Sequence, residues 1–132
     1  MEASSNARQH RRARILVVDD EPMVLKVMHR ILSDRHDVTT SESAEEALAL
    51  VRAGSDYELV VCDLMMPEMS GAEFFEELER FHPALAARVV FLSGGALTPS
   101  TRGLLSRVPN LRLEKPFDLK QIRALIDELT RG

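Results

Sequence analysis

The chain has 132 residues, 45% of them hydrophobic, which fits one domain with a single core. Its formal net charge of −4 argues against a constitutive nucleic-acid surface, and it contains no apolar run of the roughly 20 residues that cross a bilayer. The single cysteine, Cys62, excludes an internal disulfide and fits the reducing cytoplasm. From the charge, the absence of a long apolar run and the cysteine together, we expect a soluble cytoplasmic protein with no nucleic-acid or membrane partner.

The first residues differ in composition from the rest of the chain. Residues 1–13 lack apolar periodicity and contain Arg8, Arg11 and Arg12 against a single acidic residue, Glu2. Such a segment has too little apolar surface to fold alone. We therefore predict a disordered basic tail or linker at residues 1–13, followed by one domain at residues 14–131.

Apolar runs predict five strands, and a segment of helical period follows each of them. The strands are expected at about residues 15–18, 37–41, 59–62, 88–92 and 111–114. The second strand is the poorest in apolar residues, which favours an edge position. The helix start signals, in chain order, are Glu21-Pro22, Ser43 with Glu46, Ser70 with Glu73, Thr98-Pro99, and Asp118.

This alternation predicts an α/β fold, a doubly wound five-stranded parallel sheet with helices on both faces. The expected strand order is 2-1-3-4-5, and ligands of such sheets bind at the carboxyl ends of the strands, near the point where the order reverses. Strands 1 and 3 are neighbours there. Asp19, Asp20 and Asp63 should therefore meet, while Ser93 and Lys115 approach from strands 4 and 5.

These residue types indicate metal-dependent phosphoryl chemistry. Three crowded carboxylates repel one another, so they need a cation or raised pKa values. Mg²⁺ prefers oxygen ligands and is typically held by one or two carboxylates together with phosphate oxygens. A carboxylate can also act as a nucleophile and form an aspartyl phosphate. A metal, an ammonium and a hydroxyl can then neutralise the transferred group, and Lys115 and Ser93 would supply the last two.

Four segments carry a family resemblance: Val17 to Pro22, Asp63 to Gly71, Ser93-Gly94, and Lys115 to Phe117. With their spacing they resemble the chemotaxis-regulator-like receiver domain of two-component response regulators, over about residues 14–130. The resemblance implies the flavodoxin-like strand order and phosphorylation of Asp63 by a phosphohistidine of a sensor histidine kinase or a histidine phosphotransfer domain. It also implies a signalling domain that is not an enzyme beyond its own phosphoryl transfer and autodephosphorylation.

The resemblance assigns roles to the metal site as well. Asp63 would be the phosphoacceptor. Mg²⁺ would be held by Asp19, Asp20 and Asp63 together with the backbone carbonyl of Met65. The cofactor that the resemblance implies is therefore Mg²⁺ alone.

The remaining implied roles concern the phosphoryl group and the output. Ser93 would bind the phosphoryl group and Lys115 would pair with it. Phosphorylation would then change the face formed by the fourth helix, the fifth strand and the fifth helix. The family often has an aromatic residue three positions before this lysine, where its rotamer reports phosphorylation. This chain has Arg112 at that position, so its signal is expected to reach a downstream protein in another way.

Three alternative functions fit parts of the pattern. A haloacid-dehalogenase-type phosphatase also forms an aspartyl phosphate, but its nucleophile lies after the first strand in an Asp-x-Asp pattern, unlike Asp19-Asp20. A flavin binder needs a first loop that cradles phosphate, which an acidic loop repels. The third alternative is a pseudo-receiver, an interaction module independent of phosphorylation, although all five site side chains are present. The domain fits a stand-alone regulator, part of a hybrid kinase or part of a longer regulator.

Overall fold

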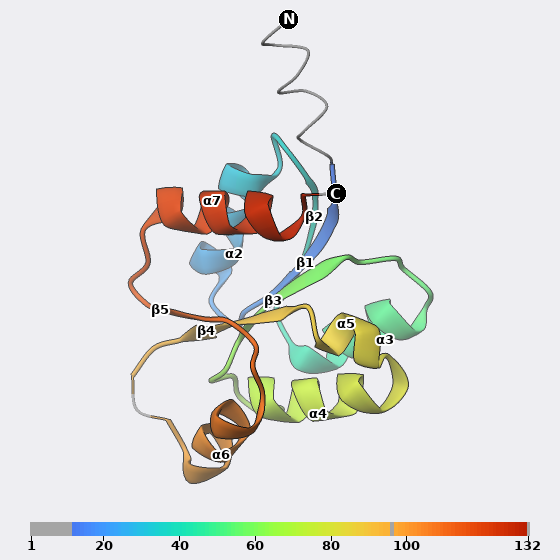
Figure 1. Cartoon of the computed structure of the whole chain (residues 1–132), viewed down its shortest axis with the longest axis vertical. Coiled ribbons are helices and arrows are strands. Elements are labelled where there is room, and N and C mark those ends of the chain that lie inside the picture. The colour runs from blue at the N-terminus through green and yellow to red at the C-terminus, as the bar shows by residue number, and fades with distance from the viewer. Residues whose placement is uncertain (1–11, 96, 132) are drawn as a thin grey trace, which may run out of the picture.

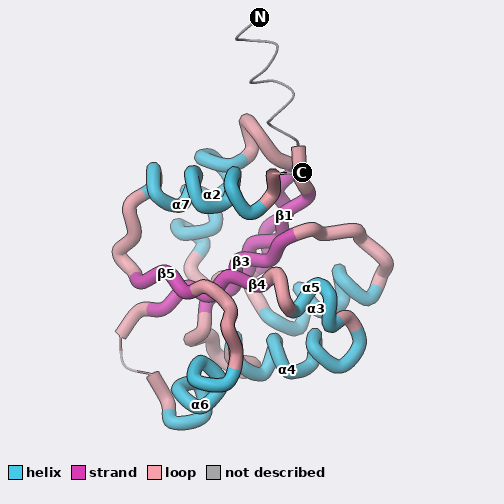
Figure 2. Tube along the Cα trace, viewed as in Figure 1, coloured by secondary structure: helices cyan, strands magenta, loops and turns pink. Residues whose placement is uncertain are grey.

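The computed structural model describes residues 12–95 and 97–131, which alternate between strands and helices (Figures 1 and 2). The strands are β1 (Arg14–Val18), β2 (Asp37–Ser41), β3 (Leu59–Asp63), β4 (Val89–Ser93) and β5 (Arg112–Glu114). The helices are α2 (Pro22–Leu32), α3 (Ala44–Arg52), α4 (Gly71–Phe81), α5 (Pro83–Ala86), α6 (Pro99–Arg107) and α7 (Leu119–Leu129). None of these helices is long and apolar enough to cross a membrane.

The five strands form one parallel sheet in the order β2-β1-β3-β4-β5. This confirms the predicted order and the edge position of β2. In the sheet register Val18 pairs with Cys62, and Ser93 pairs with Glu114. Because all strands run in the same direction, their carboxyl ends lie along one edge of the sheet. The predicted site residues lie at or just after these strand ends.

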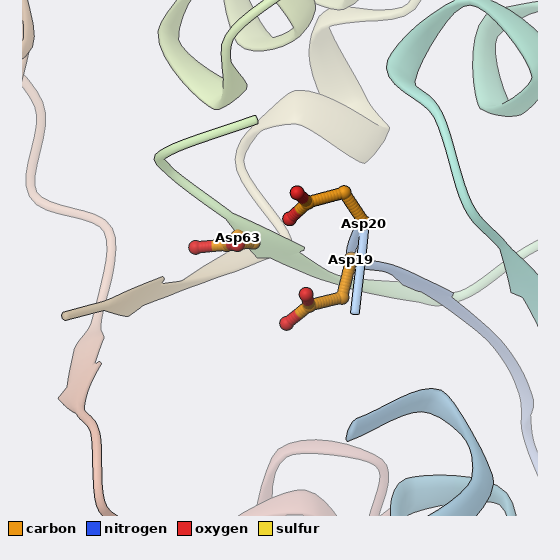
Figure 3. Close-up of side chains that lie close together, drawn as sticks. All are labelled: Asp19, Asp20 and Asp63. Carbon is orange, nitrogen blue, oxygen red and sulfur yellow. The ribbon is translucent and has the colours of Figure 1, made fainter. Parts of the chain in front are cut away.

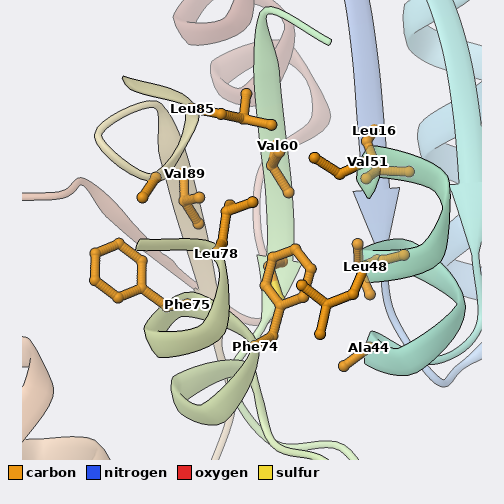
Figure 4. Packing of buried hydrophobic residues seen from close by; sticks show 14 of the residues in the cluster. Leu16, Ala44, Leu48, Val51, Val60, Phe74, Phe75, Leu78, Leu85 and Val89 are labelled. Carbon is orange, nitrogen blue, oxygen red and sulfur yellow. The ribbon is translucent and has the colours of Figure 1, made fainter. Parts of the chain in front are cut away.

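Helices cover both faces of the sheet. Figures 1 and 2 show α2 and α7 on one face, with α3, α4, α5 and α6 on the other. Alternate residues of the central strands point into the two layers: Leu16 belongs to the apolar cluster under α3 and α4, and Ile15 to the cluster under α2 and α7. Figure 4 shows Phe74 and Leu78 of α4 packed against Val60 of β3 in the first cluster. Burial of both faces explains why the central strands read as unbroken apolar runs.

The predicted start signals of two helices have different outcomes. At α4 the capping box is complete, because the Glu73 N–H donates to Ser70 Oγ over 3.2 Å and the Ser70 N–H donates to the Glu73 carboxylate over 2.9 Å. At α3 the start signal of Ser43 with Glu46 predicts the same capping box, but only half of it forms. The Glu46 N–H donates to Ser43 Oγ, but the Glu46 carboxylate accepts from the Ser41 hydroxyl at 2.8 Å. Ser41 ends the neighbouring strand β2 and is a competing donor.

The predicted tail at residues 1–11 lies outside the described residues, whereas residues 12 and 13 contact the domain. The Arg12 guanidinium lies 2.8 Å from the Asp37 carboxylate. The Ala13 N–H donates to Nδ1 of the buried His36 over 3.2 Å, so Nε2 of that ring carries a proton and donates to Asp127 of α7 over 2.8 Å. The chain entering β1 is thereby tied to β2 and α7.

Candidate functional site at the carboxyl edge of the sheet

Three carboxylates lie together where β1 and β3 end. Asp63 is the last residue of β3, and Asp19 and Asp20 directly follow β1. The pairing of Val18 with Cys62 sets the two strand ends side by side. The carboxylate oxygens of the three residues lie within 4.8 Å of one another, and Figure 3 shows the three side chains turned to the same side. The sheet thus brings the three predicted acidic residues together.

The ammonium of Lys115 lies among the carboxylates. Its Nζ is 3.0 Å from Asp19 Oδ2, 2.9 Å from Glu21 Oε1 and 3.5 Å from Asp63 Oδ2. Lys115 directly follows β5, and its backbone N–H donates to the backbone carbonyl of Ser93 over 2.7 Å. One positive charge therefore faces several negative charges, and the site keeps a net negative charge.

Met65 and Ser93 are the two remaining predicted site residues. The Met65 N–H donates to Asp63 Oδ1 over 3.3 Å. Ser93 is the last residue of β4 and is 6% exposed. A cavity of about 300 Å³ opens at the site, lined by Asp20, Glu21, Asp63, Met65, Gly94 and Lys115. Four of the six predicted site residues line it, and the buried Asp19 and Ser93 lie outside its lining.

The surroundings of Asp63 disfavour its charge. Burial, followed by the negative charge of Asp19, raises the pKa of Asp63 from 3.8 to about 6. Lys115 and the Met65 N–H act in the opposite direction, because they stabilise the carboxylate, and Asp20 raises the pKa further. Asp63 is therefore ionised at neutral pH, at a free-energy cost that a bound cation would relieve.

Two neighbouring groups keep their protons. Burial on its own lowers the pKa of Lys115, but hydrogen bonds to Glu21 and Asp19 outweigh it and raise this pKa above its usual range. Burial, with the charges of Asp63 and Asp19, raises the pKa of the Cys62 thiol. That thiol donates to the Asp63 carbonyl over 3.3 Å. Lys115 is thus a permanent cation, and Cys62 a neutral, buried side chain.

Gly71 allows the loop after β3 to return to the strand. A Cβ on Gly71 would lie 2.3 Å from the Asp63 carbonyl oxygen and 2.7 Å from Leu64 Cα, both backbone atoms. The Gly71 N–H donates to the Leu64 carbonyl over 3.0 Å. This close backbone approach fixes the end of β3, and only glycine fits it. The sequence had indicated Gly71 as part of the segment Asp63 to Gly71 that carries the family resemblance and as part of a helix start, but not as a close backbone approach.

The donor set suits Mg²⁺. Oxygen ligands at about 2.1 Å in an octahedron lie about 3 to 4.2 Å from one another, close to the spacing available within this carboxylate group. Asp20 and Asp63 both line the cavity, which leaves room for the water molecules that this ion retains. Met65 belongs to the same lining. These residues therefore fit a hard divalent cation.

A family model described as the response regulator receiver domain matches residues 15–127. The chain belongs to this family. The receiver domain is similar to the sensor kinase CckA of Brucella abortus, with 34% identity over 89% of this chain and 12% of that protein. It is also similar to the transcriptional regulatory protein TcrA of Mycobacterium tuberculosis, with 35% identity over 89% of this chain and 46% of that protein.

The fold agrees with solved receiver structures. A response regulator receiver domain protein from Clostridium thermocellum has a TM-score of 0.77 and 26% identity, covering 89% of this chain and 93% of that one. The chain thus spans almost all of a solved receiver domain but only 12% and 46% of the two curated relatives. Receiver domains are signalling domains that act with histidine kinases and downstream effectors and bind Mg²⁺ at an acidic pocket.

Sequence reasoning missed one contact of the site. It treated Glu21 as the start of a helix, whereas the structure places its carboxylate 2.9 Å from Lys115 Nζ. The available signal was local: Glu21 follows two acidic residues and precedes Pro22, which has no N–H to be capped. Its partner, however, lies 94 positions away. No local pattern indicates which cation such a residue reaches.

Proposed function

We propose that Asp63 accepts a phosphoryl group from the phosphohistidine of a sensor histidine kinase or a histidine phosphotransfer domain. The observation that carries this proposal is the setting of the Asp63 carboxylate. It ends a buried strand, its side chain is 5% exposed, and it shares a cavity with the Lys115 ammonium. A pKa of about 6 leaves it ionised at neutral pH, as an oxygen nucleophile requires.

The proposed reaction is a direct displacement at phosphorus. A carboxylate oxygen of Asp63 attacks the phosphorus atom, the bond from phosphorus to the histidine nitrogen breaks, and the imidazole leaves as a neutral ring after taking up a proton. Negative charge on the phosphoryl oxygens must be balanced while this occurs. The Lys115 Nζ, 3.5 Å from Asp63 Oδ2, is proposed to pair with one oxygen, and the Ser93 hydroxyl to donate to another.

Mg²⁺ is the proposed cofactor, held by Asp19, Asp20, Asp63 and the backbone carbonyl of Met65. When bound, the ion supplies positive charge that offsets the repulsion between the acidic site and an incoming phosphoryl group. The spacing of the three carboxylates supports this assignment. So does the raised pKa of Asp63, because charge repulsion from Asp19 contributes to it and a cation would relieve that repulsion.

Phosphorylation is proposed to change the face formed by α6, β5 and α7, to which a downstream protein would bind. One contact supports the route: the backbone carbonyl of Ser93, the last residue of β4, accepts the backbone N–H of Lys115, which follows β5. Arg112 is exposed on β5, where the family often has an aromatic residue. We propose that Arg112 pairs instead with acidic groups of this face or of the partner.

The proposed chemistry is limited to the domain's own phosphoryl transfer and autodephosphorylation, with no substrate beyond the phosphoryl donor. The net charge of −4 favours a protein partner over nucleic acid. A cytoplasmic location is part of the proposal, and the free thiol of Cys62 supports it, since reducing compartments keep cysteines unpaired.

Intact-mass spectrometry after incubation with acetyl phosphate tests the proposal. With Mg²⁺ the protein should gain one phosphoryl group, and with EDTA it should gain none. Asp63→Ala should remain unmodified, whereas Asp56→Ala, a change at an exposed aspartate outside the site, should behave as the parent does. Equal modification of Asp63→Ala would reject the assignment. A parent that accepts no phosphoryl group from acetyl phosphate or from phosphorylated kinase would favour the pseudo-receiver alternative.

A further inference from the structure

Glu21 has an unusual role for the residue that begins a helix. It occupies the N-cap position of α2, yet its side chain makes no capping hydrogen bond. Residues at this position usually accept a hydrogen bond from the first turn of the helix. The Glu21 carboxylate instead lies 2.9 Å from Lys115 Nζ, closer than the Asp63 carboxylate does. It also lines the cavity onto which Asp63 opens.

This inference rests on the proposed function, in which Lys115 must also pair with an oxygen of the phosphoryl group. An ammonium has three N–H donors, and three carboxylates already surround this one. A phosphoryl oxygen can receive a donor from Lys115 only if one of these contacts is given up. The three carboxylates of Asp19, Glu21 and Asp63 differ in how easily they can give it up.

Exposure and bonding identify the contact that breaks. The Asp19 side chain is fully buried, and its second oxygen accepts the Glu21 N–H over 2.9 Å, so it is fixed on both sides. The Asp63 contact is the longest of the three, at 3.5 Å, and its donor passes to the phosphoryl group that Asp63 carries in the proposed reaction, so a further bond from Lys115 to that group requires the contact with Asp19 or Glu21 to break. The Glu21 side chain is 60% exposed and can turn into solvent, where water replaces the ammonium at little cost.

We propose that Glu21 is a positioning residue that holds Lys115 in the resting site and competes with the phosphoryl group for its ammonium. In the resting state the contact holds Nζ of Lys115, a residue of the cavity lining, 3.5 Å from Asp63 Oδ2. On phosphorylation Lys115 leaves Glu21 for the phosphoryl group, and the Glu21 carboxylate turns into solvent. Glu21 therefore stabilises the unphosphorylated state relative to the phosphorylated one.

The resting contact is testable without metal or phosphate. Urea unfolding in EDTA of the parent, Glu21→Gln, Lys115→Met and the double variant gives the coupling between the two side chains. The expected coupling is favourable and changes the unfolding equilibrium constant by about two- to fivefold, as for a pair with one exposed partner. Absence of coupling would mean that the two side chains do not pair, and would overturn the inference.

The competition is tested with beryllium fluoride, a mimic of the phosphoryl group, at Mg²⁺ concentrations that saturate each protein. Glu21→Gln keeps the shape of an exposed side chain, and it should bind beryllium fluoride about two- to fivefold more tightly than the parent. Glu42→Gln removes an equal charge from an exposed residue outside the Lys115 contacts and should bind as the parent does.

The outcomes separate the two proposals. Unchanged or weaker beryllium fluoride binding by Glu21→Gln, with normal binding by the parent, would overturn the role of Glu21 and leave Asp63 as phosphoacceptor. A parent that fails to bind beryllium fluoride with Mg²⁺ would overturn the proposed function itself. Tighter binding by both glutamine variants would assign the effect to net charge and would also overturn the competition for Lys115.

Discussion

Replacing Asp63 by asparagine should stabilise the metal-free protein at neutral pH. Asparagine keeps the shape of the side chain and removes the charge that burial and Asp19 disfavour. A pKa that rises from 3.8 in the unfolded chain to about 6 in the folded protein corresponds to about 3 kcal/mol. The side chain is only 5% exposed, so solvent screens little of this cost. We expect Asp63→Asn to gain up to about 3 kcal/mol, or about 10 °C in Tm.

The gain should depend on pH with a definite sign. Between pH 3.8 and about 6 the folded protein binds more protons at Asp63 than the unfolded chain does. Stability of the parent therefore falls as pH rises through this window. The asparagine variant has no such carboxylate. Its advantage over the parent should be complete by about pH 7 and should shrink to less than about 1 kcal/mol at pH 4.

Urea unfolding in EDTA from pH 4 to pH 8 measures the difference. Asp56→Asn, a change at an exposed aspartate outside the site, should stay within about 0.5 kcal/mol of the parent. Added Mg²⁺ should stabilise the parent more than it stabilises Asp63→Asn. Equal stability of parent and Asp63→Asn at pH 7.5, or a difference that grows toward pH 4, would refute the electrostatic reasoning.

Three further predictions concern the scaffold and the metal. Gly71→Ala should cost about 2 kcal/mol or more, because its Cβ would lie 2.3 Å from the Asp63 carbonyl, whereas Gly103→Ala in α6, with open space around it, should gain about 0.5 to 1 kcal/mol; thermal unfolding compares the two, and equal effects would contradict this. His36→Phe should lose about 2 to 3 kcal/mol in chemical unfolding, since the Ala13 N–H loses its acceptor and Asp127 keeps only its contact with Arg35; unchanged stability would show that these bonds contribute nothing net. Asp20→Asn should raise the Tm of the metal-free protein and weaken Mg²⁺ binding about tenfold or more by calorimetry; unchanged affinity would remove Asp20 from the proposed site.

The arrangement of the sheet was predictable because both of its faces are buried. β3 and β4 read as unbroken apolar runs, and β2 stands out because it has few apolar residues, as an edge strand can. Right-handed crossovers then leave few topologies. Once the order was set, the meeting of Asp19, Asp20 and Asp63 followed from their places at strand ends, without any knowledge of side-chain geometry.

One helix and several side-chain contacts were not predicted. The four-residue helix α5 is too short to produce a helical period. The contacts join residues without a shared local pattern. Glu46 accepts from Ser41 instead of completing its capping box, because two acceptable partners compete and only the fold decides between them. The pairing of Glu21 with Lys115 depends on how β1 and β5 are spaced across the sheet. Side-chain partners across the fold need coordinates, whereas strand order does not.

Mapping the phosphorylated residue tests the central claim most directly. The protein would be incubated with phosphorylated histidine kinase or acetyl phosphate in Mg²⁺, and hydroxylamine would then convert any acyl phosphate into a hydroxamate for peptide mass spectrometry. The account predicts a hydroxamate at Asp63 after incubation in Mg²⁺ and none after incubation in EDTA. A hydroxamate at Asp19 or Asp20, or a hydroxylamine-stable phosphate on Ser93, would contradict it.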